Sequence, residues 1–315
     1  MAAGTASPRC SMLPVRTVAI RCNFPGRAVC LRQVRLTKKG RSMTITISTR
    51  AGFGLLCVLL LSATFAPSAR ATDYRKSYAV AGRASVRVLA AHGSVRVTTA
   101  DANTVEFIVT YDRGAGSSDL PVESRQIGQV VELRALTNSH SSWWNWSHFE
   151  NVHLSIEVRM PKNADLQIDT SNGAVSLDTI RGAVKVRTTN AAISANGVDG
   201  RCALATTNGR VEASGRFQAL DISSSNAGVT ARAQSGSRMD FEWSIRTSNG
   251  GIELSVPPDL KANLSAATTN GGIMLQLPVA VEGEQRGSHL RGTLGGGGPE
   301  LVVSTTNAGV RLDAG

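Results

Sequence analysis

The sequence predicts an all-β fold, namely a parallel, β-helix-like β-solenoid of roughly 18–21-residue repeats with an atypical N-terminal β cap. Two observations predict it. A corner motif of two Ser or Thr residues, Asn, and then Gly or Ala recurs along the chain, and apolar and polar residues alternate on both sides of it. The corner Asn stands at Asn172, Asn190, Asn208, Asn226, Asn249, Asn270 and Asn307. The intervals are 18, 18, 18, 23, 21 and 37 residues, so the array is regular with a few insertions.

Each repeat indicates which of its side chains face inward. Four positions of each repeat carry an apolar or small residue: those six and four residues before the Asn, and those three and five residues after it. Around Asn208 these residues are Cys202, Leu204, Val211 and Ala213. Polar residues lie between them, which is typical of half-buried strands. The residue two before the Asn is always Thr or Ser. The hydroxyl side chains and the Asn side chains are therefore expected to point inward at a corner. The residue after the Asn is Gly, which accepts positive φ at little cost, or Ala.

Two folds fit the pattern of strand, Asn-Gly and strand. One is a meander of β-hairpins, for which Asn-Gly between alternating runs is a strong signal. The other is the solenoid, in which each repeat is one coil and equivalent residues lie about 4.8 Å apart in neighbouring coils. In a meander, equivalent positions of the repeats would not need to keep the same type of residue, so the pattern favours the solenoid. Its Asn side chains would form a hydrogen-bonded ladder that satisfies the buried corner.

The formal net charge of +11 belongs to the N-terminal segment. Residues 1–71 hold 11 of the 34 Lys and Arg and none of the 23 Asp and Glu, which leaves 23 residues of each sign in the remainder. A folded part that is formally neutral offers no basic face. No nucleic-acid partner is therefore expected.

Residues 43–71 are predicted to be a signal peptide. Arg50 precedes an apolar run over 51–65, and small residues at Ala69 and Ala71 predict cleavage near Ala71. The run is short for a membrane span, so no stable span is expected after cleavage, and a retained anchor is the alternative. Residues 1–42 lack the repeat and precede a normal signal-peptide start at Met43. They are interpreted as an extension from a misassigned start, with a transit peptide as the other interpretation.

Residues 72–160 are predicted to form an N-terminal β region. Its first part is a degenerate copy of the repeat with His92 in the place of the Asn, where a corner hydrogen bond is the favoured role over metal ligation. Three strands without the corner motif are predicted to cap the stack, at 105–111, 129–134 and 152–158. Residues 161–315 are predicted to be the regular array, with a bulge at 235–238 and a mobile loop over 279–299.

A cluster of aromatic residues is the strongest candidate contact surface. Three of the four Trp residues lie within four positions, at Trp143, Trp144 and Trp146, and Phe149 follows them. Clustered aromatics on a loop can stack sugar rings or grip apolar partners. The favoured interpretation is that they plug the end of the solenoid.

The chain lacks the motifs of common catalytic, phosphate-binding and calcium-binding sites, so no catalytic, cofactor-binding or metal residue is predicted. Acidic residues such as Asp169, Asp178 and Asp199 occur at unlike slots of the repeat, so they do not stack into a carboxylate cluster. Cys202, the one cysteine left after cleavage, occupies an inward slot. It is predicted to be a buried small residue and not a nucleophile.

The sequence resembles a bacterial family of β-strand-repeat domains of unknown function named "putative adhesin". The resemblance rests on a signal peptide, the segments 78–88, 92–97 and 158–162, and copies such as 170–177 and 247–254, and it covers nearly all of 78–313. It implies an exported all-β repeat protein of the envelope and transfers no catalytic residues.

Two hypotheses for function follow. The first is an exported, non-enzymatic β-repeat protein of the bacterial cell envelope, an adhesin or scaffold located in the periplasm or outside the cell. It would bind cell-envelope glycan or another envelope protein through its strand faces or through residues 139–149. The alternative is a carbohydrate-active enzyme on a β-helix scaffold.

Overall fold

The computed structural model describes residues 34–39, 42–47, 71–112, 122–135, 154–277, 279–281 and 288–315. The chain divides into two units, Met1–Ser68 and Ala69–Gly315. In the first, β1 (Val34–Lys39) and β2 (Ser42–Ile47) pair antiparallel. All elements in the described ranges are strands, which confirms the all-β class, and no helix there is long and apolar enough to cross a membrane.

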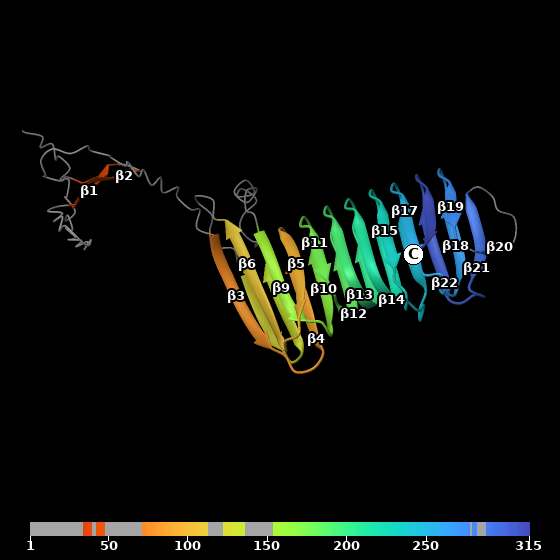
Figure 1. Ribbon diagram of the computed structural model, residues 1–315, viewed down its shortest axis with the longest axis horizontal. Coiled ribbons are helices and arrows are strands. Elements are labelled where there is room, and N and C mark those ends of the chain that lie inside the picture. The colour runs from red at the N-terminus through yellow and green to blue at the C-terminus, as the bar shows by residue number, and fades with distance from the viewer. Residues whose placement is uncertain are drawn as a thin grey trace, which may run out of the picture. The chain divides into compact units, whose positions relative to one another are not determined.

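The strands of the second unit, β3 to β23, form one continuous sheet of 21 strands, with parallel and antiparallel pairs (Figure 1). A typical repeat contributes one strand before its corner Asn and one after it. Strands before the corner pair with their equivalents in neighbouring repeats and form ladder A, and strands after the corner form ladder B in the same way. Two long strands, β13 and β14, run through the opposite corner of the coil and belong to both ladders.

Ladder A contains, in order of pairing, β7 (Val122–Ile127), β8 (Val130–Ala135), β4 (Ala84–Ala90), β10 (Ala164–Thr170), β12 (Arg181–Arg187), the ends of β13 (Ile193–Ala205) and β14 (Val211–Ser224), β16 (Trp243–Thr247), β22 (Glu300–Thr305), β18 (Ala262–Thr268), β21 (His289–Leu294) and β20 (Ala280–Val281). Ladder B contains β3 (Ala71–Ala79), β6 (Thr104–Asp112), β9 (Leu154–Pro161), β5 (Ser94–Ala100), β11 (Val175–Asp178), the starts of β13 and β14, β15 (Val229–Ala233), β17 (Ile252–Val256), β23 (Val310–Ala314) and β19 (Ile273–Gln276).

The inward slots predicted from the sequence form columns in register. In ladder A the residues six before the corner pair in the order Val86, Leu166, Val184, Cys202, Leu220, Trp243, Leu301 and Leu264. In ladder B those three after it pair in the order Val95, Val175, Ile193, Val211, Val229, Ile252, Val310 and Ile273. Nearly all are buried, so like side chains pack on like from layer to layer. The widest, Trp243, meets Phe217 edge to face with ring centroids 6.0 Å apart.

The hydroxyls at the corner are buried and the Asn side chains are exposed. The Ser or Thr two residues before each Asn is 2–8% exposed, whereas all seven Asn are exposed. Thr206 shows the role of the hydroxyl: Oγ1 donates to the carbonyl of Ala191 in the next layer and accepts from Gly209 N–H, both at 3.2 Å. The expectation that the Asn side chains lie inside the corner is wrong, because the Ser and Thr side chains occupy the interior there and the Asn side chains are exposed.

The corner also brings backbones of neighbouring layers unusually close. A Cβ on Gly209 would lie 1.7 Å from the carbonyl oxygen of Ala191, and one on Gly250 would lie 2.2 Å from that of Ala227. Real Cβ atoms do not approach so closely, and Gly and Ala alternate between layers at this slot. The residue after the Asn is therefore restricted by stacking.

The exposed Asn side chains are joined in one row of hydrogen bonds. The layer order is Asn172, Asn190, Asn208, Asn226, Asn249, Asn307 and Asn270, and the Nδ2 of each Asn after the first donates to the Oδ1 of the Asn in the preceding layer over 2.6–2.8 Å. At the N-terminal end, Nδ2 of Asn172 lies 3.0 Å from Nδ1 of His92. The degenerate copy at 84–100 therefore stacks in register with the regular array, as its sequence predicts.

The order of layers differs from the order of the chain at the C-terminal end. The last copy, β22 and β23, lies between the copy of β16 and β17 and the copy of β18 and β19, as the dark blue strands of Figure 1 show. Part of the segment predicted to be a mobile loop forms β21, which pairs antiparallel with β18. The chain first forms the layer of β18 and β19 and then returns, so its final repeat lies inside the stack and not at its end.

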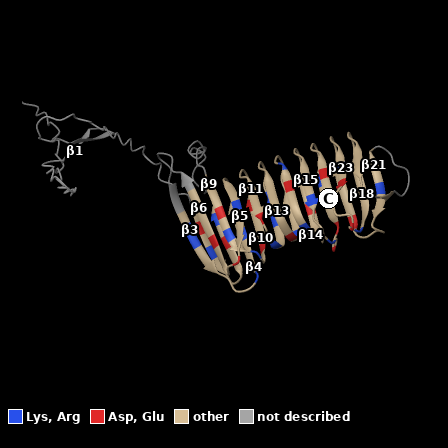
Figure 2. Ribbon diagram, in the orientation of Figure 1, with Lys and Arg blue, Asp and Glu red and all other residues tan. Residues whose placement is uncertain are grey.

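The N-terminal cap is also antiparallel in part. The pairs β3–β6, β6–β9 and β7–β8 are antiparallel. Of these, β7 and β8 are consecutive in the chain and join through a tight turn with Gly128 at φ 58°. Blue and red residues are mixed on β3, β6 and β9 in Figure 2. The sheet is therefore mixed: the parallel pairing predicted for the repeats gives way to antiparallel pairs in the predicted cap and at the C-terminal end of the stack.

One charged side chain in this cap is buried and is surrounded by half-exposed arginines. Glu132 on β8 is 5% exposed, and its carboxylate accepts from Arg134 and from Arg125 (3.1 Å), while Arg87 Nη1 lies 3.9 Å away. Burial alone would raise the pKa of Glu132, but the Arg134 hydrogen bond and the three positive charges outweigh it and hold the pKa below its ordinary value. The carboxylate therefore stays ionised and stabilises the cap at neutral pH.

We expect Asn208→Leu to lower the free energy of unfolding by about 1 kcal/mol, because it removes one bond to Asn190 and one from Asn226 at an exposed position. Chemical denaturation measures this. The matched control is Thr207→Leu, at an exposed neighbour without a side-chain bond in the described part of the chain. Equal stability of the two variants would contradict a stabilising role for the row.

Acid should weaken the cap through Glu132. Since its folded pKa lies below the ordinary 4.5, its stabilisation is complete above that pH and is lost as the pH falls through the folded pKa. Glu132→Gln should lower stability at pH 7 by about 1 kcal/mol, because its arginine partners are half exposed and screened, and should flatten the decline below pH 4.5. Melting curves recorded across pH test this prediction, with the Glu123→Gln variant as the control. An unchanged acid profile would contradict it.

Candidate functional site

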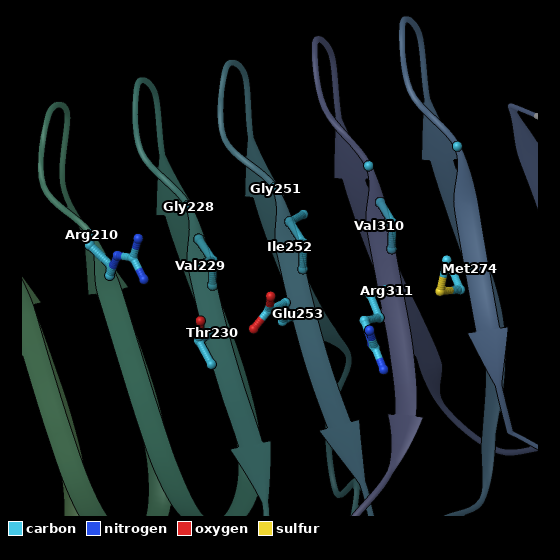
Figure 3. A pocket seen from close by; sticks show the side chains of 12 residues that line it. Arg210, Gly228, Val229, Thr230, Gly251, Ile252, Glu253, Met274, Val310 and Arg311 are labelled. Atoms are coloured by element: carbon cyan, nitrogen blue, oxygen red, sulfur yellow. The ribbon is translucent and has the colours of Figure 1, made fainter.

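The outer face of ladder B carries a groove of about 410 Å3 near the C-terminal end of the stack (Figure 3). It crosses the start of β14 and the strands β15, β17, β23 and β19. We call it the glycine groove, because its floor is formed by the second residue after each corner Asn, namely Gly228, Gly251, Gly309 and Gly272. Arg210, Thr230, Glu253, Arg311 and Met274 surround this floor.

The bare floor follows from residue choice at one slot of the repeat. Earlier layers carry Ala174, Ala192 and Arg210 at this slot, so a side chain is compatible with the coil. A Cβ on Gly272 would meet nothing within 4 Å, and one on Gly251 would lie 3.5 Å from a carbonyl oxygen, an ordinary contact. Stacking therefore does not require glycine at these two positions, unlike at Gly209.

The walls of the groove offer both charges and one apolar side chain. Arg311 donates to Asp313 through Nε (2.7 Å) and to Gln276 through Nη2 (3.4 Å). Arg210 and Glu253 form no ion pair within the described ranges, and Met274 is 54% exposed. The groove thus offers free hydrogen-bond donors, one free carboxylate and a thioether around a flat floor of peptide groups. These groups suit an extended, polar and uncharged ligand that lies across the strands.

The site has no arrangement of nucleophile, base or metal ligands. In the described part of the chain no three His, Cys, Asp or Glu residues gather to hold a metal ion. Cys202 is fully buried in its column, and burial raises the pKa of its thiol to about 12. It packs as a small apolar residue.

The residues predicted as contacts fall elsewhere. Trp143, Trp144, Trp146 and Phe149 lie outside the described residues. The row of Asn side chains lines the corner next to the groove and does not enter it. Sequence reasoning missed the groove because it considered the first, third and fifth residues after each Asn and not the second. The second residue after the Asn carries the signal for the groove, because it is Gly in four layers and Ala or Arg in earlier copies.

No protein-family model matches the chain, and no curated protein matches it in sequence. Among solved structures it is similar to a "putative cell adhesion protein" of Clostridium sporogenes, with 10% identity over 78% of this chain and 100% of the other and a TM-score of 0.37. It is also similar to a "putative adhesin" of Bacteroides fragilis (11%, 77% and 97%, TM-score 0.36) and one of Parabacteroides merdae (11%, 76% and 95%, TM-score 0.38). These names agree with that of the family that the sequence resembles.

Proposed function

We propose that this chain is an exported, non-enzymatic β-repeat protein of the bacterial cell envelope, an adhesin or scaffold that holds an extended ligand on a strand face. The observation that carries the proposal is the glycine groove, in which four layers leave out a side chain that stacking would accept at two of them. At about 4.8 Å per layer, the four glycines span roughly 14 Å across the strands. That length suits a segment of a polymer such as cell-envelope glycan, or a strand-like segment of another envelope protein.

The architecture that presents this face is proposed to be a parallel β-solenoid. Ladders A and B would be its two sides, each coil running along ladder A, through the Asn corner and along ladder B. The parallel register from β4 and β5 to β22 and β23 supports this, and the antiparallel strands at both ends would close the stack.

Export is proposed from the apolar run at 51–65 and the small residues at Ala69 and Ala71. Cleavage near Ala71 would leave Thr72 at the start of β3 and place the repeat unit in the periplasm or outside the cell. The aromatic residues at 143–149 remain a proposed second contact or a plug.

The glycine groove supports binding over hydrolysis. Glycoside hydrolysis ordinarily uses two carboxyl groups that flank the bond to be cleaved. Glu253 is the single carboxylate in the lining of this groove, so a carbohydrate-active enzyme would need a different site.

We expect Gly251→Val to block the floor of the groove without unfolding the chain, since its Cβ meets only an ordinary contact. Sedimentation of the purified protein with isolated peptidoglycan sacculi measures binding. The variant should lose about tenfold in affinity, which corresponds to about 1.4 kcal/mol.

The matched control is Ala192→Val, at the same slot of a layer outside the groove. It should bind as the unchanged protein does and keep the same melting midpoint. Undiminished binding by Gly251→Val would contradict the groove as the contact, and no binding by the unchanged protein would contradict glycan adhesion.

A further inference from the structure

A second hollow of about 530 Å3 lies at the opposite corner of the coil, where ladder B leads into ladder A. We call it the arginine groove, because Arg83, Arg181 and Arg201 from three different layers line it, with the amides of Asn163 and Gln218 beside them. None of its lining side chains is an apolar group larger than that of Ala. Its chemistry therefore differs from that of the glycine groove.

The floor of the arginine groove is bare backbone. A Cβ on Gly182 would lie 2.2 Å from the carbonyl oxygen of Ala164, and one on Gly200 would lie 2.4 Å from that of Gly182. Gly200 also has φ 138°, a conformation that favours glycine. Only glycine fits these two layers, and both glycines are buried, so the backbones of neighbouring layers lie close together beneath the arginines.

The carboxylates of the groove already have protein partners. Asp165 accepts from Arg83 Nε (3.0 Å) and Nη2 (2.6 Å) and from Ala183 N–H (2.7 Å), and the Arg83 hydrogen bond holds the pKa of Asp165 below its ordinary value. Asp199 pairs with Arg216 through Oδ2. Both carboxylates thus have arginine partners, and Asp165, whose pKa is lowered, does not suit the role of a general acid.

Two of the arginines have guanidinium groups to spare. Arg181 Nε lies 3.9 Å from Asp199, beyond hydrogen-bond distance. Arg201 forms no ion pair within the described ranges; its Cζ lies 4.6 Å from the centre of the Phe241 ring, which is 50% exposed. The Phe241 ring thus makes a cation–π contact with the Arg201 guanidinium, and planar guanidinium groups bind carboxylates through paired hydrogen bonds.

We infer that the arginine groove binds an acidic polysaccharide, with Arg181 and Arg201 pairing with its anionic groups. Asn163 and Gln218 can hydrogen-bond the hydroxyls of the sugar, and the exposed ring of Phe241 offers a face to the next one. A nucleic acid fits less well, since residues 72–315 hold 23 basic and 23 acidic residues and are formally neutral. A peptide side chain of apolar character would find no pocket here.

Fluorescence anisotropy of labelled oligogalacturonate with the full purified chain tests the inference. We expect saturable binding that weakens with added salt. The double variant Arg181→Gln/Arg201→Gln should bind about tenfold more weakly or worse, as expected for loss of anchoring arginines. The control Arg232→Gln removes an exposed arginine of ladder B and should leave binding unchanged. An unchanged melting midpoint in each variant shows that folding is intact.

Competitors separate the sources of the anion. Competition by sulfated dextran as well as by galacturonate supports acidic sugars of either kind, and competition by galacturonate alone supports carboxylated ones. Any of four results would overturn the inference: equal binding of neutral maltohexaose, competition by inorganic polyphosphate alone, absence of binding, or full affinity in the double variant. None of these results bears on Gly251→Val, which alters the other groove.

Discussion

The structure depends on close contact between equivalent corners of neighbouring layers. At six of the seven corners with Asn a buried hydroxyl, such as that of Thr206, donates to a carbonyl of a neighbouring layer. The residue after the Asn lies so near the neighbouring layer that it is Gly or Ala at every one of these corners. This contact sets the register of both ladders at once, because every strand leaves a corner whose position is fixed. The columns of Val, Ile and Leu then pack like on like, and the Asn side chains align on the outside.

A stack held together through its corners and its interior leaves its outer faces free to vary. Positions such as Gly251 and Arg201 point outward, and the coil accepts several residue types at their slots. Grooves can therefore form wherever successive layers omit or repeat a side chain. The glycine groove arises in this way on ladder B, and the arginine groove arises where a tight second corner requires glycine at 182 and 200. The proposed contacts thus need no departure from the repeat.

The sequence predicted the columns residue by residue, because period-two alternation fixes which side chains face inward once the corner is recognised. It also placed the copy with His92 correctly in the stack and Cys202 in a buried column. It did not predict the exposure of the Asn side chains, because burial at a corner depends on the path of the backbone and not on the alternation. It could not order the last layers either, since equivalent repeats fit each other equally well. The placement of β22 between β16 and β18 follows from the return of β21.

Cross-linking tests the layer order most directly, because adjacent layers are about 4.8 Å apart and alternate layers about twice that, and a disulfide needs Cα atoms within about 7 Å. Ser248, Thr306 and Thr269 are exposed and occupy the same slot, just before the corner Asn, in three consecutive layers. The account predicts that Ser248→Cys/Thr306→Cys forms a disulfide under mild oxidation and that Ser248→Cys/Thr269→Cys does not, with Cys202 remaining buried in both. A disulfide between positions 248 and 269, and none between 248 and 306, would contradict the stacking described.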